Sequence, residues 1–198
     1  MDEALRTELL ALRDEDRCVR SELAADGSLH EGYHPRMQAV HEHNAHRLEE
    51  IVSQQGWPGR ALVGDDGAEA AWLIVQHAIG LPSFQRRCLE LLQSAAIHKE
   101  APSWQPAYLL DRILVFEGKP QVYGTQFDRD QHGEMNCCQV EDPADLNARR
   151  AAIGLDSIEE RTRMMRAQAK SEPEQAASDR AAHQRKYQEW LKRVGWRD

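Results

Sequence analysis

Apolar residues recur every three or four positions along the first half of the chain, the spacing of helices that bury one face. The first stripe predicts a helix over residues 2–25 and consists of Leu5, Leu9, Leu12, Val19 and Leu23. The second begins after His34-Pro35, ends near Gly56, and consists of Met37, Val40, Leu48 and Ile51. Residues 67–79 are apolar almost all round, which predicts the central and most buried helix.

The pattern changes in the second half of the chain. Further helices are expected over residues 83–97 and 106–118. Two short β-favouring segments follow, separated by a polar loop with Gly133, and predict a hairpin near residues 121–141. Later helices are expected over residues 142–154 and 157–170 and at the charged C-terminus. The fold class is therefore mainly α: a compact helical domain over residues 1–160 with one small β-hairpin, and a C-terminal helical extension over residues 161–198.

Composition supports a globular protein and narrows its location. The 198 residues can bury a core without disulfides. No apolar run reaches the ~18 residues of a membrane span, and charges stand where a secretory signal would be apolar. The four cysteines lack CxxC spacing and are expected to be reduced thiols. These features predict a cytoplasmic protein that does not engage a membrane.

The net charge of −8 argues against a nucleic-acid partner, because phosphate binding rests on clustered basic side chains. The charge is uneven: residues 161–198 carry a net +5 and the preceding residues −13. The favoured interpretation is a solvated terminal helix beside its own acidic domain. The alternative is a protein partner that binds through this C-terminal helix.

Polar side chains interrupt several of the predicted apolar faces. Asp16 falls within the first stripe, and His41 and Asn44 fall within the second. Gln76 and His77 lie in the all-apolar helix, and Asp111 has apolar neighbours one turn away on both sides. Because an unpaired buried carboxylate costs several kcal/mol, Asp16 and Asp111 each require a partner.

These interruptions predict either separate hydrogen bonds between helices or one shared pocket. In a shared pocket, the expected catalytic residues are His41, His77, Asp16 and Asp111. The expected substrate-binding residues are Asn44, Gln76, Tyr108, Arg112 and Gln126. An imidazole held by a carboxylate could act as general base, and the same groups could equally bind a divalent metal. No HExxH motif decides between these two chemistries.

Several segments together resemble a family of bacterial proteins classified as a domain of unknown function. Its ordered motifs occur here as GWPG, VQHA, YLLDRILV and YGTQ, and the resemblance covers about residues 5–160. The resemblance carries over to Asp16, His41, Asn44, Trp57, Gln76, His77, Tyr108, Asp111, Arg112, Gly124 and Gln126. Ile79 departs from the pattern, since an aspartate is expected there, and the tail beyond about Lys170 has no counterpart. The resemblance implies no reaction.

Two function classes follow from the sequence. The first is a hydrolase-like enzyme with a buried pocket of histidine, aspartate and glutamine side chains. Its substrate would be a small polar molecule or a peptide, and a divalent metal is a possible cofactor. The second is a non-catalytic interaction module of the immunity or adaptor type.

Overall fold

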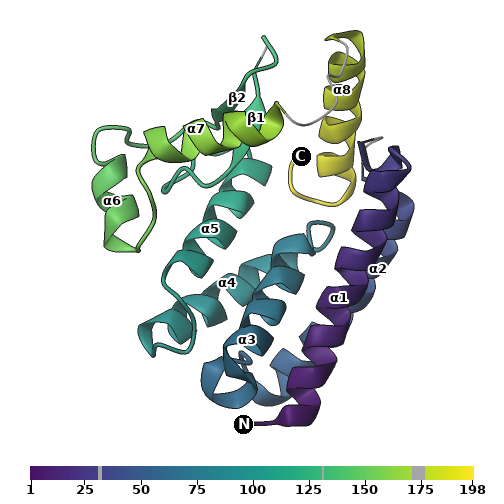
Figure 1. Cartoon of the computed structure of the whole chain (residues 1–198), viewed down its shortest axis with the longest axis vertical. Coiled ribbons are helices and arrows are strands. Elements are labelled where there is room, and N and C mark those ends of the chain that lie inside the picture. The colour runs from purple at the N-terminus through teal and green to yellow at the C-terminus, as the bar shows by residue number, and fades with distance from the viewer. Residues whose placement is uncertain (31–32, 131, 171–176) are drawn as a thin grey trace. The chain divides into compact units, whose positions relative to one another are not determined.

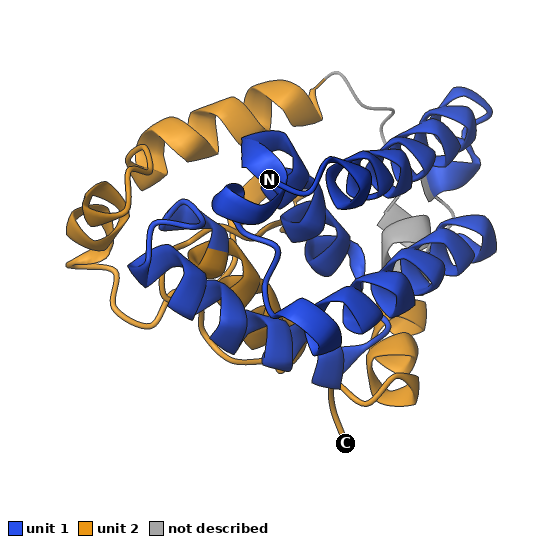
Figure 2. Cartoon of the chain, turned by 90° about the horizontal axis from the view of Figure 1, so that it is seen from below, with its two compact units in different colours: residues 1–105 blue, residues 106–198 orange. Residues whose placement is uncertain are grey.

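The computed structural model describes residues 1–30, 33–130, 132–170 and 177–198 of the chain. As predicted, these residues form mostly helices together with one two-stranded antiparallel hairpin and a C-terminal helix (Figure 1). They divide into two compact units, residues 1–105 and 106–198, which Figure 2 colours separately. The boundary expected after residue 160, between the helical domain and its C-terminal extension, falls within a helix of the second unit and stays a prediction.

The first unit is built from helices whose apolar faces pack together. Its helices are α1 (Glu3–Ala25), η1 (Ser28–His30), α2 (Pro35–Gln55), α3 (Arg60–His77) and α4 (Pro82–Ile97). Helix α1 packs against both α2 and α3, and α3 also contacts α4. The core side chains with no more than 1% exposure include Leu9, Leu48, Ile51, Val63, Val75 and Leu92. The helical phase read from the sequence therefore places the buried faces correctly.

Helix starts and breaks in this unit follow from local chemistry. The carboxylate of Asp2 accepts the backbone N–H of Leu5 and so caps α1. Helix α3 begins at Arg60, earlier than the predicted start at residue 67, and is broken at Gly64. Gly64 has a φ of 73°, in the left-handed region that glycine tolerates. The predicted central helix is the segment that follows this break.

The second unit contains most of α5 (Trp104–Phe116) and all later elements. These are β1 (Phe127–Arg129), β2 (Met135–Cys137), α6 (Leu146–Ala152), α7 (Ile158–Ala169) and α8 (Ala177–Arg193). In the hairpin, Phe127 pairs with Cys137 and Arg129 with Met135. Residues 122–126, part of a segment expected as a strand, form a loop instead, because the N–H groups of Val122, Tyr123 and Thr125 donate to a side chain of α5 rather than to a second strand.

The end of the chain packs within the second unit. Trp190, Leu191 and Trp196 are buried, and the rings of Trp190 and Trp196 contact Phe116. The Arg197 guanidinium donates to the backbone carbonyl of Phe116 at 2.7 Å. Trp190 of the terminal helix thus packs on Phe116 of its own unit, and a protein partner for this helix stays a prediction.

Within the described ranges, none of the helices combines the length and apolar character that crossing a bilayer requires.

Candidate functional site

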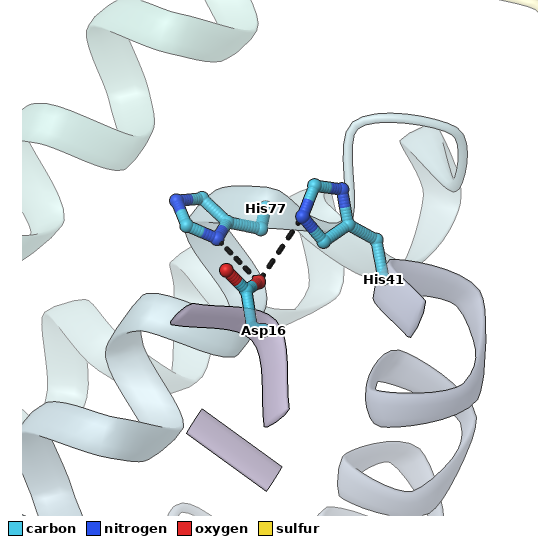
Figure 3. Close-up of side chains that lie close together, drawn as sticks. All are labelled: Asp16, His41 and His77. Atoms are coloured by element: carbon cyan, nitrogen blue, oxygen red, sulfur yellow. Dashed lines mark hydrogen bonds and ion pairs between the residues drawn. The ribbon is translucent and has the colours of Figure 1, made fainter. Parts of the chain in front are cut away.

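Three of the four predicted catalytic residues meet inside the first unit. Asp16 comes from α1, His41 from α2 and His77 from the last position of α3 (Figure 3). His77 Nδ1 lies 2.7 Å from Asp16 Oδ2, within hydrogen-bond distance. His41 Nε2 lies 3.1 Å from the same carboxylate oxygen. One oxygen therefore faces two imidazole rings that come from two different helices.

The local sequence explains why these side chains point inward. Asp16 and His41 sit on the apolar stripes of their helices and are only 3% and 9% exposed. His77 stands where α3 ends, and its side chain remains partly accessible, at 27%. The buried amide of Gln85 donates to the carbonyl of Val75 at 2.6 Å, which secures the helix end just before His77.

Two polar atoms of this cluster lack a hydrogen-bond partner in the described part of the chain. They are Oδ1 of Asp16 and Nε2 of His41. The 3.1 Å approach of His41 Nε2 to Asp16 is a close polar contact whose geometry is not that of an aligned hydrogen bond. Leaving such atoms unpaired in the interior costs about 1–3 kcal/mol each. The cluster by itself therefore leaves buried polar groups unsatisfied.

The surroundings of Asp16 keep its carboxylate ionised. Burial favours the neutral acid, but the contacts from His41 and His77 outweigh burial and hold the pKa of Asp16 well below its usual range. The centre therefore contains a fixed negative charge beside two imidazoles. A carboxylate with so low a pKa is a weak proton acceptor and a good ligand for a cation.

Sequence reasoning missed one member of this cluster, Tyr33. Its hydroxyl lies 2.8 Å from His41 Nδ1, and the two rings stack with centroids 5.6 Å apart and planes 25° apart. Tyr33 precedes α2 and belongs to no helix, so the helical phase test could not place it. Its proximity to the His34-Pro35 helix start was the only available signal.

The donor atoms of Asp16, His41 and His77 all lie within 4.8 Å of one another. Two imidazole nitrogens and one carboxylate oxygen are ligands that suit first-row transition metals. The two imidazole rings lie with centroids 5.0 Å apart and are tilted by 42°. Three protein donors leave further coordination positions open, as in catalytic rather than structural zinc sites. The residues present thus fit a divalent cation.

Two predicted substrate-binding residues flank this cluster. Asn44 lies one turn after His41 on the same face of α2, is 1% exposed, and donates through Nδ2 to the Leu12 carbonyl at 2.9 Å. This hydrogen bond joins α2 to α1 one turn before Asp16. Gln76, which precedes His77, is also buried. Both were correctly expected in the interior, and their contact with a substrate stays a prediction.

The fourth predicted catalytic residue, Asp111, lies in the second unit, where its contacts are structural. Oδ1 accepts the backbone N–H of Val122 at 2.8 Å, and Oδ2 accepts the N–H and the hydroxyl of Thr125, both at 3.0 Å. From the opposite side, Arg150 donates to the carbonyl of Tyr123 at 2.7 Å. Asp111 thus organises the loop over residues 122–126.

The remaining predicted substrate-binding residues also belong to the second unit. Gln126 donates through Nε2 to the Thr125 hydroxyl at 3.0 Å. Tyr108 and Arg112 are half-buried on α5. Burial lowers the pKa of the Arg112 guanidinium to about 10, which still leaves it positively charged at neutral pH. A substrate contact of these three residues stays a prediction.

Comparison with known proteins gives one match. Residues 3–170 match the model of a family of unknown function (DUF6624). No curated protein and no solved structure matches the chain.

Proposed function

We propose that this chain, which belongs to the DUF6624 family of unknown function, is a divalent-metal-dependent enzyme. Asp16, His41 and His77 are its metal ligands. The observation that carries this proposal is the convergence of three donor atoms, from three helices, within 4.8 Å. Two of the three side chains are buried, where water cannot stabilise them.

Charge and unsatisfied atoms favour a cation over a purely structural cluster. Asp16 stays ionised, and one of its oxygens has no donor in the described part of the chain. His41 Nε2 lies close to Asp16 without an aligned hydrogen bond. A cation would bond to all three donors and compensate the buried charge. Imidazole ligands favour zinc, iron or other first-row ions over magnesium and calcium.

The reaction class that fits this centre is hydrolysis of a small polar molecule or a peptide. Held by Asp16, His41 and His77, a divalent ion would supply a Lewis acid for a substrate carbonyl and would lower the pKa of a bound water toward neutral. In the overall reaction, the water oxygen bonds to the acyl carbon and the bond to the leaving group breaks. One water proton then ends on the leaving group and the other on the new carboxyl group. Asp16 and the histidines contribute by holding the cation in place.

A metal titration with matched variants tests the proposal. The protein is stripped with a chelator and titrated with Co²⁺ and Zn²⁺, followed by the visible absorption of Co²⁺ and by elemental analysis. The test variants are Asp16→Asn and His77→Ala. The controls are Asp14→Asn and His43→Ala, which change exposed residues of α1 and α2. We expect about one equivalent in the wild type and the controls, and at least tenfold weaker binding in the test variants.

Equal binding by test and control variants, or no binding by the wild type, would refute the metal centre. Activity is then followed on ester, amide and phosphoester probes with and without the metal. Hydrolysis that survives the chelator would exclude the metal-dependent mechanism.

One observation favours a second candidate, an acid–base enzyme without a metal. The 2.7 Å contact allows His77 Nδ1–H to donate to Asp16, which would leave Nε2 as a general base. Activity that survives the chelator but is lost in His77→Ala would identify this mechanism.

A further inference from the structure

The contact between Tyr33 and His41 bears on how the centre selects one ring nitrogen. A neutral imidazole carries its proton on one nitrogen and can bind a metal only through the other. His41 Nε2 faces Asp16, whereas Nδ1 lies 2.8 Å from the Tyr33 hydroxyl. Nε2 is therefore the atom that would bind the cation, and in the metal-bound ring the proton lies on Nδ1.

We infer that Tyr33 is a positioning residue of the metal centre: when a cation occupies Nε2 of His41, the hydroxyl oxygen of Tyr33 accepts Nδ1–H and holds the ring with Nε2 aimed at the cation. This inference rests on the proposed metal-binding function and assigns Tyr33 no contact with the metal. Histidine ligands of metals usually donate their other N–H to an acceptor, which fixes the tautomer and the ring orientation.

The position of Tyr33 suits an acceptor for Nδ1–H. A tyrosine hydroxyl is protonated at neutral pH and offers lone pairs to an N–H donor. The stacking of the two rings limits rotation of the imidazole as well. The ring orientation and the hydrogen bond of Nδ1 thus depend on the same side chain.

The first measurement identifies the His41 nitrogen that binds Zn²⁺ in the metal-loaded protein. Long-range ¹⁵N–¹H correlation spectra of histidine-labelled protein distinguish a metal on Nε2 from a metal on Nδ1, and His41→Gln assigns the signal. We expect Zn²⁺ on Nε2 and the proton on Nδ1 in the wild type, and an Nδ1–H that exchanges faster with water in Tyr33→Phe. Zn²⁺ on Nδ1 of His41 in the wild type would overturn the inference even if the variant failed to fold.

The second measurement is metal affinity. Tyr33→Phe removes only the hydroxyl, and we expect its Kd for Co²⁺ to rise about 10- to 100-fold, with an altered absorption spectrum. Equal affinity and equal spectra in wild type and Tyr33→Phe would refute the role of Tyr33 while leaving the metal centre intact. A wild type that binds no Co²⁺ would refute the proposed function itself, so the two failures are distinguishable.

Discussion

Asp111→Asn is the substitution that separates a structural from a catalytic aspartate in the second unit. Asp111 is fully buried and accepts hydrogen bonds through both oxygens, from Val122, Tyr123 and Thr125. Asparagine keeps the shape of the side chain but replaces one acceptor oxygen with a donor NH₂ group. With its oxygen toward Val122, the new amide nitrogen would face the backbone N–H of Thr125, and these two donors cannot bond.

The orphaned N–H of Thr125 sets the magnitude. A buried donor without an acceptor costs about 1–3 kcal/mol, whereas the Thr125 hydroxyl can rotate and accept from the new NH₂ group. Burial raises the pKa of Asp111, so removing its charge relieves some desolvation and keeps the net loss within that range. We therefore expect the free energy of unfolding to fall by about 1–3 kcal/mol.

Urea unfolding measures this loss as a lower transition midpoint with an unchanged slope. The matched control is Asp145→Asn, an exposed aspartate of the same unit whose side chain makes no capping hydrogen bond. We expect the control to stay within about 0.5 kcal/mol of the wild type. If Asp111→Asn were as stable as the control, its hydrogen bonds would not hold the loop and the structural role would be wrong.

Three other predictions follow from single contacts. The hydrogen bond from Arg6 lowers the pKa of Asp66 to about 2. This pair therefore stabilises above about pH 4 and is lost as the pH falls through about 2, so Asp66→Asn should flatten acid unfolding over that window. Cys18 is exposed, whereas burial raises the pKa of the other three thiols. A thiol reagent at pH 8 should therefore label about one thiol rapidly in the wild type, and the rapid phase should be absent in Cys18→Ser. Gln85→Met removes the hydrogen bond to the Val75 carbonyl and should weaken metal binding, because the end of α3 before His77 is then less firmly held. The free energy of unfolding in urea should fall by less than about 1.5 kcal/mol.

Helical phase was enough to find Asp16 and His41 because both lie on long amphipathic helices. Asp16 and His41 interrupt apolar stripes, and an interrupted stripe points its polar member into the core. Phase fixes the direction of a side chain but not its partner. Asp111 satisfied the same test, yet its partners are N–H groups of a loop 11 to 14 residues later.

The loop and the missed tyrosine share a physical reason. Residues 122–126 have the composition of a strand, and β propensity describes a half-buried pleated surface rather than an intrinsic backbone preference. Here the N–H groups of Val122, Tyr123 and Thr125 bond to Asp111, and the carbonyls of Tyr123 and Gly124 accept from Arg150, so these groups are not available for strand pairing. Tyr33 reaches His41 from a connection without periodicity. In both cases a residue outside the regular elements is placed by a hydrogen bond to a side chain of a helix, which periodicity does not reveal.

The energetics of the centre argue against a role confined to joining helices. Replacing buried ionic groups with well-packed apolar residues is often neutral or stabilising, and the stripes around Asp16 and His41 are otherwise apolar. A bound cation changes this balance, because it bonds to the orphaned atoms and binds the folded unit but not the unfolded chain. At a free metal concentration of 100 times Kd, the folded state gains about 2.7 kcal/mol. The Tm of thermal unfolding should therefore rise with increasing Zn²⁺ in the wild type and in His43→Ala. An equal rise of the Tm in Asp16→Asn would contradict ligation by the Asp16 carboxylate.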